Sequence, residues 1–203
     1  MGTDIVVVSG LPRSGTSLMM QMLDSGGLAV VTDHLRTADT DNPRGYYEYE
    51  QVKKVNQDAS WLPATRGKAF KMVSQLLYDL PPTERYRIIF MERDLDEVLL
   101  SQEKMLARLG RPAAPREAIK RSFTLHLHRL HDWLRGQPHL EVLRVSYNDL
   151  VQRPAEEARR VSEFLGGASY ADKMMESVDP SLYRNRKVPS GHPESTVADA
   201  PAR

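Results

Sequence analysis

Cysteine is absent from this 203-residue chain, and no apolar run approaches the length of a membrane-spanning helix. The first absence excludes disulfides, thiolate nucleophiles and cysteine-based metal sites, and the second argues against a transmembrane span. An excess of one charge is missing as well, because 28 lysines and arginines face 27 aspartates and glutamates. With a net charge of +1, the chain has no overall field that would attract nucleic acid. Any anion binding must therefore come from a local arrangement of residues.

The length of the chain suits one domain with its own hydrophobic core. We expect this single domain to comprise residues 1–188. Residues 189–203 contain too few apolar side chains to pack, so a disordered tail is expected there. The first apolar run starts at Ile5, too early for a secretory or transit segment ahead of it, and a cytoplasmic location is expected.

The most informative segment begins with that first apolar run. Ile5–Val8 has the composition of a buried strand, Ser9–Ser17 is a short loop with two glycines, and an apolar helical pattern follows from Leu18. A strand, a tight turn and a helix N-terminus gather backbone N–H groups and the positive end of a helix dipole around one point. The segment therefore predicts a binding site for a phosphate or a group of similar shape.

The loop differs from that of an ATP hydrolase at one position. In the pattern G-x-x-x-x-G-K-[ST], the lysine reaches the outer phosphates and the hydroxyl holds magnesium. Gly10, Gly15 and Ser17 are in register with this pattern. Thr16 occupies the lysine position, and the cation stands instead inside the loop as Arg13. This change would impair a nucleotide hydrolase, but it suits a site that grips one 5′-phosphate and places a guanidinium beside a leaving group.

Strand and helix patterns alternate along the rest of the chain. Near-continuous apolar strands separated by amphipathic helices predict an α/β fold with a parallel sheet and helices on both faces, a three-layer architecture like that of the P-loop nucleoside-triphosphate hydrolases. The expected strands are Ile5–Val8, Ala69–Val73, Arg87–Met91 and Leu140–Val145, with a further short one considered at Leu28–Val31. The expected helices are Thr16–Ser25, Tyr46–Ser60, Leu95–Leu109, Glu117–Leu134 and Ala155–Leu165, and Asp33–Gly45 is a polar loop.

A second candidate anchor follows the strand Arg87–Met91. Arg93 stands at the carboxyl end of this strand and Ser101 about two turns into the next helix. Ligands of open α/β sheets bind at that end of the strands, so an arginine and a hydroxyl there suit a second phosphate. Two alternatives remain. In one, Glu92 or Asp94 is a magnesium-binding acid; in the other, Arg93 forms only a surface ion pair with Asp96 or Glu97.

Together, the two anchors resemble those of the sulfotransferases that use 3′-phosphoadenosine 5′-phosphosulfate (PAPS). Pro12–Ser17 is similar to their 5′-phosphosulfate loop, in the arginine variant of the tyrosylprotein and many bacterial members. Arg93 and Ser101 match the spacing of the family's 3′-phosphate pair. Val145–Leu150 resembles a later strand-end segment, and Asn42–Glu48 resembles a segment of small bacterial members. The resemblance extends from Ile5 to Leu165.

The resemblance implies roles for the matching residues. Arg13 would neutralise the departing 5′-phosphate by bidentate electrostatics, because an arginine does not act as an acid. The 5′-phosphate would be held by Ser14, Gly15, Thr16 and Ser17, the 3′-phosphate by Arg93 and Ser101, and the adenine would lie near Tyr147. Arg184 and Arg186 belong to a late basic segment that would close over the 3′-phosphate, or that is simply a basic tail. No metal is expected.

The general base is less well defined. By family position the base is Asp33 or His34 after the first helix, or Glu48 at the opening of the next, preferred in the order Asp33, Glu48, His34. Asp33 can instead cap a turn, and Glu48 can be a first-turn residue that the helix dipole favours. Lys71 assists at the sulfuryl group or is a solvated lysine of an edge strand.

The implied activity is sulfuryl transfer to the hydroxyl or amine of a small-molecule, carbohydrate or peptide acceptor. The alternatives are a P-loop nucleotide-dependent kinase, which Thr16 disfavours, and a nucleotide-binding module without turnover. His126, His128 and His131 lie on one expected helix, but only the last two share a face, so a metal site is not expected. No motif identifies the acceptor or an oligomeric state.

Overall fold

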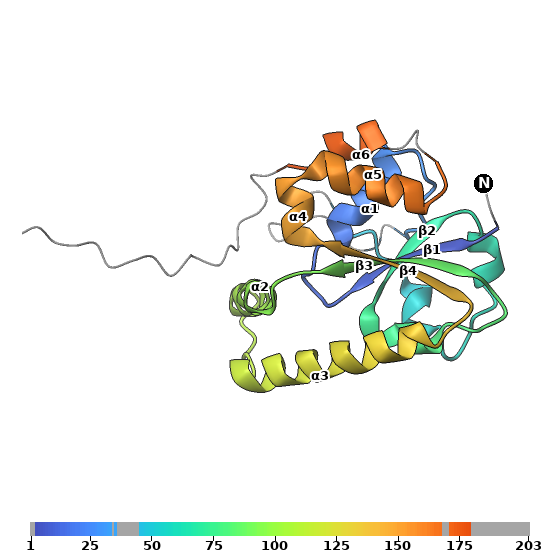
Figure 1. The fold of residues 1–203 in the computed structure, drawn as a ribbon. Helices are drawn as coiled ribbons and strands as arrows, with labels where there is room; N and C mark the ends of the chain where they lie inside the picture. The colour runs from blue at the N-terminus through green and yellow to red at the C-terminus, as the bar shows by residue number, and fades with distance from the viewer. Residues whose placement is uncertain (1–2, 34, 36–44, 168–170, 180–203) are drawn as a thin grey trace, which may run out of the picture.

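A four-stranded parallel sheet forms the centre of the protein in the computed structural model, which describes residues 3–33, 35, 45–167 and 171–179 (Figure 1). The strands are β1 Ile5–Gly10, β2 Ala69–Val73, β3 Tyr86–Glu92 and β4 Leu140–Ser146. Their order across the sheet is β2-β1-β3-β4. All six residues of β1 are buried, as expected for a central strand with helices on both faces.

Six α-helices are described, and the four longest confirm helices expected from the sequence to within one or two residues at each end. The helices are α1 Thr16–Ser25, α2 Leu95–Arg108, α3 Arg116–Arg135, α4 Tyr147–Gln152, α5 Pro154–Phe164 and α6 Ala171–Glu176. Three short 3₁₀ helices, η1 Glu50–Lys54, η2 Leu62–Thr65 and η3 Ser74–Asp79, precede or follow β2. Helices α4 and α6 and the 3₁₀ segments were not expected, because each is too short to show a period in the sequence.

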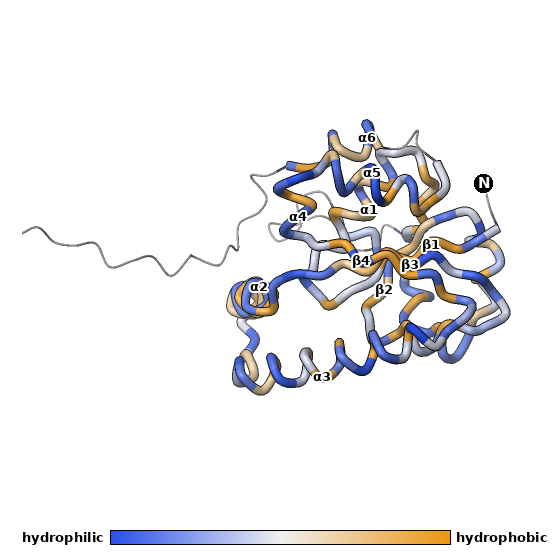
Figure 2. Tube along the Cα trace, in the orientation of Figure 1, coloured by the Kyte–Doolittle hydropathy of each residue, from blue (hydrophilic) through white to orange (hydrophobic). Residues whose placement is uncertain are grey.

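Alternate residues of the strands fill two hydrophobic cores on opposite faces of the sheet. Val6 and Val8 pack under α1, α4, α5 and α6. Ile5 and Val7 pack on the other side, against α3 and the 3₁₀ segments. Figure 2 shows the strands as the apolar centre of the molecule, with polar stretches on the outer helices. The two cores confirm the three-layer α/β architecture.

The sheet register brings several strand ends to one edge. Gly10, the last residue of β1, pairs with Val73 on one side and Met91 on the other, and Glu92 pairs with Ser146. The chain leaves β1 for β2 on one side and then returns to β3 on the other, so the order reverses between β1 and β3. Open α/β sheets bind ligands at such a switch point, beyond the carboxyl ends of the strands.

Two expected elements are wrong. Tyr46–Ser60 is not a helix, since only Glu50–Lys54 is helical there, as a 3₁₀ turn. The apolar spacing that suggested a helix instead buries Val52 and Val55 from an irregular chain. Leu28–Val31 contributes only one isolated bridge, Val30 to Ala69, rather than a strand.

Other expectations lie outside the described residues. These are most of the polar loop Asp33–Gly45 and the whole tail 189–203. Among the helices of the described part of the chain, none is both long and apolar enough to cross a membrane.

Candidate functional site

The loop after β1 has the shape of an anion cradle. It runs from the end of the strand to Gly15, the N-cap residue of α1, whose φ of 100° lies in the left-handed region. Because glycine has no side chain, no capping group covers the first-turn amides of α1. Arg13 also has a positive φ, 70°, which is uncommon for a residue with a side chain and typical of strained functional loops.

Two glycines of the loop are needed for close packing. A Cβ atom on Gly10 would lie 2.5 Å from Ser14 Oγ and 2.6 Å from the carbonyl oxygen of Met91. A Cβ atom on Gly15 would lie 2.3 Å from Cδ2 of the Tyr147 ring. The hydroxyl oxygen of Ser14 is buried and has no hydrogen-bond partner in the structure. A tightly packed loop with open amides and an orphan buried hydroxyl fits the phosphate group for which it was predicted.

The two predicted anchors meet in space. Arg13 Nε donates a hydrogen bond of 3.0 Å to Ser101 Oγ, across 88 residues of sequence. Arg93 Nη1 donates to the carbonyl oxygen of Arg13 at 3.3 Å. The loop after β1 and the junction of β3 with α2 therefore form one continuous polar surface at the edge predicted by the strand order.

Arg93 is buried rather than exposed. Its side chain is 7% exposed and forms an ion pair of 3.0 Å with Glu97, whose side chain is 3% exposed. The expected alternative of an ion pair with a nearby acid thus exists, but it is a buried pair and not a surface one. Its guanidinium carbon lies 4.4 Å from the centre of the Tyr147 ring, within the range of a cation–π contact.

The acids considered as magnesium ligands have structural partners. The Asp94 side chain caps α2 by accepting hydrogen bonds from the amides of Asp96 and Glu97. Glu92 pairs with Arg144 at 2.6 Å. Among the described residues, no group of three or more histidine, aspartate and glutamate side chains could hold a metal ion.

Tyr147 lies between the two anchors. It is the first residue of α4 and is 7% exposed, with its ring against Gly15 and Arg93. The resemblance implied that Tyr147 lies near the adenine; the structure shows that its ring contacts a residue of each predicted anchor. Its position explains why Gly15 is needed, because any side chain there would displace the ring.

Lys71 ties a second segment to the loop. From the centre of β2, its Nζ donates to Ser17 Oγ at 3.3 Å and to the carbonyl oxygen of Tyr46. Tyr47, the next residue, has a positive φ of 52°. Its hydroxyl donates to Asp24 Oδ2 at 3.0 Å, and burial, followed by this hydrogen bond, raises the pKa of Tyr47 to about 12. The chain that carries Glu48 is thus held beside α1, through Lys71 to Ser17 near the start of the helix and through Tyr47 to Asp24 near its end.

Asp33 and Glu48 are neighbours with different roles. The two carboxylate oxygens of Asp33 accept the amides of Leu35 at 3.0 Å and Glu50 at 2.6 Å. These backbone hydrogen bonds, led by that of Leu35, lower the pKa of Asp33 below its usual value. The backbone oxygen of Glu48 accepts a hydrogen bond from the amide of Asp33. The carboxylate of Glu48 lies 3.9 Å from Lys53 Nζ, and 21% of the Glu48 side chain is exposed. The contacts of Asp33 are those of a residue that caps a turn, which was the alternative to a general base for Asp33.

The remaining site candidates divide into described and undescribed residues. His34, Arg184 and Arg186 lie outside the described part of the chain. The histidines of α3 have separate contacts: His126 Nε2 lies 2.9 Å from Ser74 Oγ, His128 Nδ1 lies 3.1 Å from Asp132, and His131 Nε2 lies 3.6 Å from Glu92.

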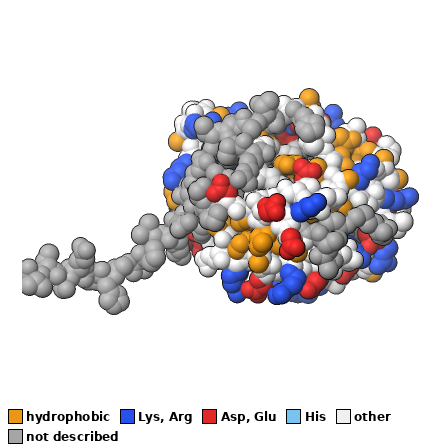
Figure 3. All heavy atoms as spheres, turned by 90° about the horizontal axis from the view of Figure 1, so that it is seen from above, with side chains coloured by type: hydrophobic (Ala, Val, Ile, Leu, Met, Phe, Trp, Pro, Cys, Tyr) orange, Lys and Arg blue, Asp and Glu red, His pale blue; other side chains and the backbone are white. Residues whose placement is uncertain are grey.

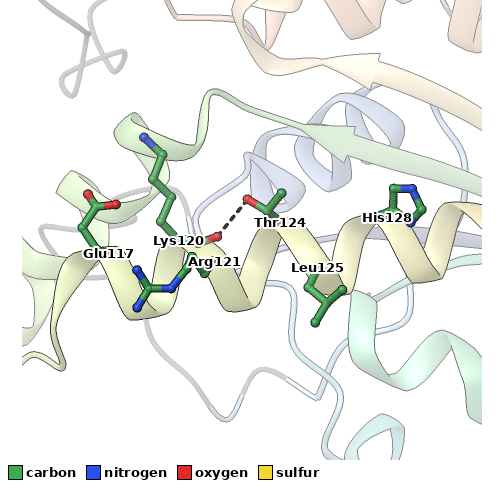
Figure 4. A pocket seen from close by; sticks show the side chains of 6 residues that line it. All are labelled: Glu117, Lys120, Arg121, Thr124, Leu125 and His128. Carbon is green, nitrogen blue, oxygen red and sulfur yellow. Dashed lines mark hydrogen bonds between the residues drawn. The ribbon is translucent and has the colours of Figure 1, made fainter.

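A shallow surface pocket lies away from these anchors, along the outside of α3. Figure 4 shows that its lining side chains all come from this helix and project from it in different directions: Glu117, Lys120, Arg121, Thr124, Leu125 and His128. Lys120 is committed to an ion pair of 2.8 Å with Asp96 of α2. On the face seen in Figure 3, acidic and basic side chains are interspersed, with no large patch of one sign. The loop after β1 therefore remains the candidate site, in preference to the pocket on α3 or the face in Figure 3.

Sequence reasoning missed two polar residues at this site. Glu97 was considered only as a surface partner of Arg93, and Asn148, whose Nδ2 lies 3.4 Å from both Glu97 carboxylate oxygens, was noted only as part of the segment Val145–Leu150. The four-residue spacing from Arg93 to Glu97 was the available signal for the first. The second follows another strand, and no local pattern indicates that its side chain meets Glu97.

Comparison with known proteins agrees with this geometry. Residues 3–189 match the sulfotransferase domain family, so the chain belongs to that family. No curated protein matches the sequence. The fold is similar to the sulfotransferase domain from the curacin biosynthetic pathway, with 15% identity, a TM-score of 0.55, and coverage of 90% of this chain and 83% of that one. It is also similar to the sulfotransferase domain from the Synechococcus PCC 7002 olefin synthase, with 18% identity, a TM-score of 0.55, and coverage of 94% and 90%.

Proposed function

We propose that this member of the sulfotransferase domain family transfers a sulfuryl group from PAPS to an acceptor hydroxyl or amine. The observation that carries the proposal is the contact of Arg13 with Ser101, which joins a lysine-free phosphate loop to a second arginine–serine anchor. Two adjoining anchors for anions suit a donor that is phosphorylated at both the 5′ and the 3′ position. The proposed acceptor is a small molecule, a carbohydrate or a peptide.

The donor would occupy the edge between β1 and β3. The amides of Gly15, Thr16 and Ser17 and the hydroxyls of the last two would hold the 5′-phosphate. Arg93 and Ser101 would hold the 3′-phosphate, and the hydroxyl of Ser101 would exchange its bond with Arg13 for one with this phosphate. Arg13 would then be released to turn toward the bridging oxygen between sulfur and phosphorus.

The chemistry requires alignment and charge stabilisation, as in phosphoryl transfer. An acceptor oxygen or nitrogen forms a bond to sulfur while the bond from sulfur to the 5′-phosphate oxygen breaks. The electron pair of that bond leaves on adenosine 3′,5′-bisphosphate, where Arg13 neutralises the charge. Lys71, whose Nζ lies 3.3 Å from Ser17 Oγ, would neutralise the oxygens of the sulfuryl group during transfer.

We assign the general base to Glu48 in preference to Asp33. Asp33 uses both carboxylate oxygens to bind backbone amides, which favour its ionised form and make it a poor proton acceptor. Glu48 follows the strained residue Tyr47 and lies two residues from the carbonyl that Lys71 binds. In this assignment Glu48 takes the acceptor proton, and Asp33 holds the segment in place. His34 stays a third candidate.

The kinase alternative predicts a different ligand. A kinase of this sheet topology would bind ATP with magnesium, for which the loop has Thr16 where the lysine would stand. A binding module without turnover would bind the bisphosphate but would transfer no sulfuryl group. Both alternatives are therefore separable from the proposal by one binding measurement and one activity measurement.

The binding test is calorimetry with adenosine 3′,5′-bisphosphate and with magnesium–ATP, on wild type and Arg93→Ala. We expect micromolar binding of the bisphosphate by wild type, weakened about 10- to 100-fold in the variant, as for the loss of a charged hydrogen bond. Equal binding of both ligands by both proteins would overturn the second anchor. Formation of the bisphosphate from PAPS in the presence of phenol, alcohol and amine acceptors then separates the enzyme from the module.

A further inference from the structure

We propose that Glu97 is a positioning residue that sets the selectivity of this site for nucleotides bearing a 3′-phosphate, by fixing the guanidinium of Arg93. The inference rests on the proposed function, because it assigns the 3′-phosphate to Arg93. Glu97 itself does not touch the ligand in this arrangement. It acts through the orientation of the arginine.

Glu97 binds the Nε side of the Arg93 guanidinium. Its Oε2 accepts a hydrogen bond of 3.0 Å from Arg93 Nε. Arg93 Nη1 donates instead to the loop carbonyl of Arg13 at 3.3 Å. Nε is therefore held by the carboxylate, while Nη1 faces the loop after β1.

The carboxylate is in turn held from a second element. Asn148 of α4 donates from Nδ2 toward both oxygens of Glu97, at 3.4 Å each. Glu97 belongs to the first turn of α2, so the carboxylate links the helices that follow β3 and β4. The neighbouring Tyr147 lies under the guanidinium, with its ring centre 4.4 Å from Cζ of Arg93. Arg93 is thus held by a carboxylate, an aromatic ring and a backbone carbonyl.

Burial makes the orientation depend on the charge of Glu97. With side-chain exposures of 7% and 3%, neither charge of the pair is well solvated. Removing one partner of a buried ion pair leaves the other charge uncompensated, and the remaining side chain moves to regain solvent or a new partner. Glu97→Gln would also replace one of the two oxygens that now accept from Arg93 and Asn148 by an NH2 donor. The guanidinium would then no longer be held in the orientation that binds the 3′-phosphate. Ordering it when the ligand binds would cost conformational entropy and would weaken the affinity.

The test compares two ligands that differ only in the 3′-phosphate. Calorimetry measures the affinities of adenosine 3′,5′-bisphosphate and adenosine 5′-monophosphate for wild type, Glu97→Gln and Glu97→Asp. We expect Glu97→Gln to lose about tenfold in affinity for the bisphosphate, as for one charged hydrogen bond, and less than about twofold for the monophosphate. Glu97→Asp keeps the charge on a shorter side chain, so we expect a smaller loss. This second variant also carries the test if Glu97→Gln does not fold.

The matched control is Asp96→Asn. Asp96 is the preceding residue of α2 and pairs with Lys120 and Arg116 of α3 instead of Arg93. We expect this control to leave the ratio of the two affinities unchanged, even if it lowers the melting temperature. In an Arg93→Ala background, Glu97→Gln should cause no further loss of bisphosphate affinity, because the residue acts through the arginine.

Failure of this inference differs from failure of the proposed function. If wild type prefers the bisphosphate and Glu97→Gln keeps that preference or binds it more tightly, the positioning role is wrong and the proposed function stands. An equal further loss in the Arg93→Ala background would show a general structural role and would also overturn it. If wild type binds both ligands equally, the assignment of the second anchor is wrong and the inference falls with it.

Discussion

The donor side and the proposed acceptor side of the site are held together in different ways. Around the loop after β1, buried and half-buried polar side chains bind one another across three strand ends, as in Arg13 with Ser101 and Arg93 with Glu97. The segment that carries Glu48 is bound mainly through backbone groups, which Asp33 and Lys71 hold at separate points. The proposed donor side is thus held by mutually dependent side chains. The other side depends on a few independent contacts, so changes to the two sides should have different consequences.

The largest effect is expected from Arg13→Ala. Removal of the cation beside the leaving group should lower kcat by about 100- to 1,000-fold, as for the loss of one electrostatic contact to the transition state. The measurement is bisphosphate formation from PAPS at saturating donor. Arg13→Gly provides the matched control, because glycine adopts the φ of 70° without strain. The two variants should lose activity equally while Arg13→Gly melts at the higher temperature. Full activity in both would contradict the role of Arg13.

A smaller effect is expected on the other side of the site. Glu48→Gln should lower kcat by about 100-fold, because a base is lost, while bisphosphate affinity stays unchanged. Asp33→Asn should instead lower the melting temperature, because one oxygen that accepts a backbone amide is replaced by a donor. Its kcat should change less than that of Glu48→Gln. If Asp33→Asn causes the greater loss of kcat at full donor binding, the base is Asp33 and the assignment to Glu48 is wrong.

The smallest effect concerns a contact between α3 and η3, where the half-buried His126 lies 2.9 Å from Ser74 Oγ. Burial lowers the pKa of His126, so the folded state favours the neutral ring. Its contribution to stability is present above the unfolded pKa near 6.5 and is lost as the pH falls through the lower folded value. Between pH 7 and 5.5, the melting temperature of wild type should fall by about 1 to 2 °C more than that of His126→Gln. If the melting temperatures of the two proteins fall equally, the folded state does not favour the neutral ring of His126.

The parts of the fold that followed from the sequence are those with a strong local pattern. The strand β1 and the helix α1 were predicted from adjoining local signals. These are a fully apolar run, a loop with glycines, and the pair Gly26 and Gly27 that ends the helix. The expected helix Tyr46–Ser60 failed for the opposite reason. Its apolar spacing was helical, but the chain is turned by the cap of Asp33 on Glu50 and by the positive φ of Tyr47, which are tertiary contacts and local strain.

The candidate site divides in the same way. The sequence alone determined the glycine loop between β1 and α1, the missing lysine and the strand-end position of Arg93, since glycine spacing and apolar runs are properties of neighbouring residues. Only the tertiary structure decided that Arg13 meets Ser101 across 88 residues, and that Glu97 meets Asn148 across 51. The physical reason is the parallel sheet, which brings the carboxyl ends of distant strands to one edge and so joins side chains that no local pattern relates.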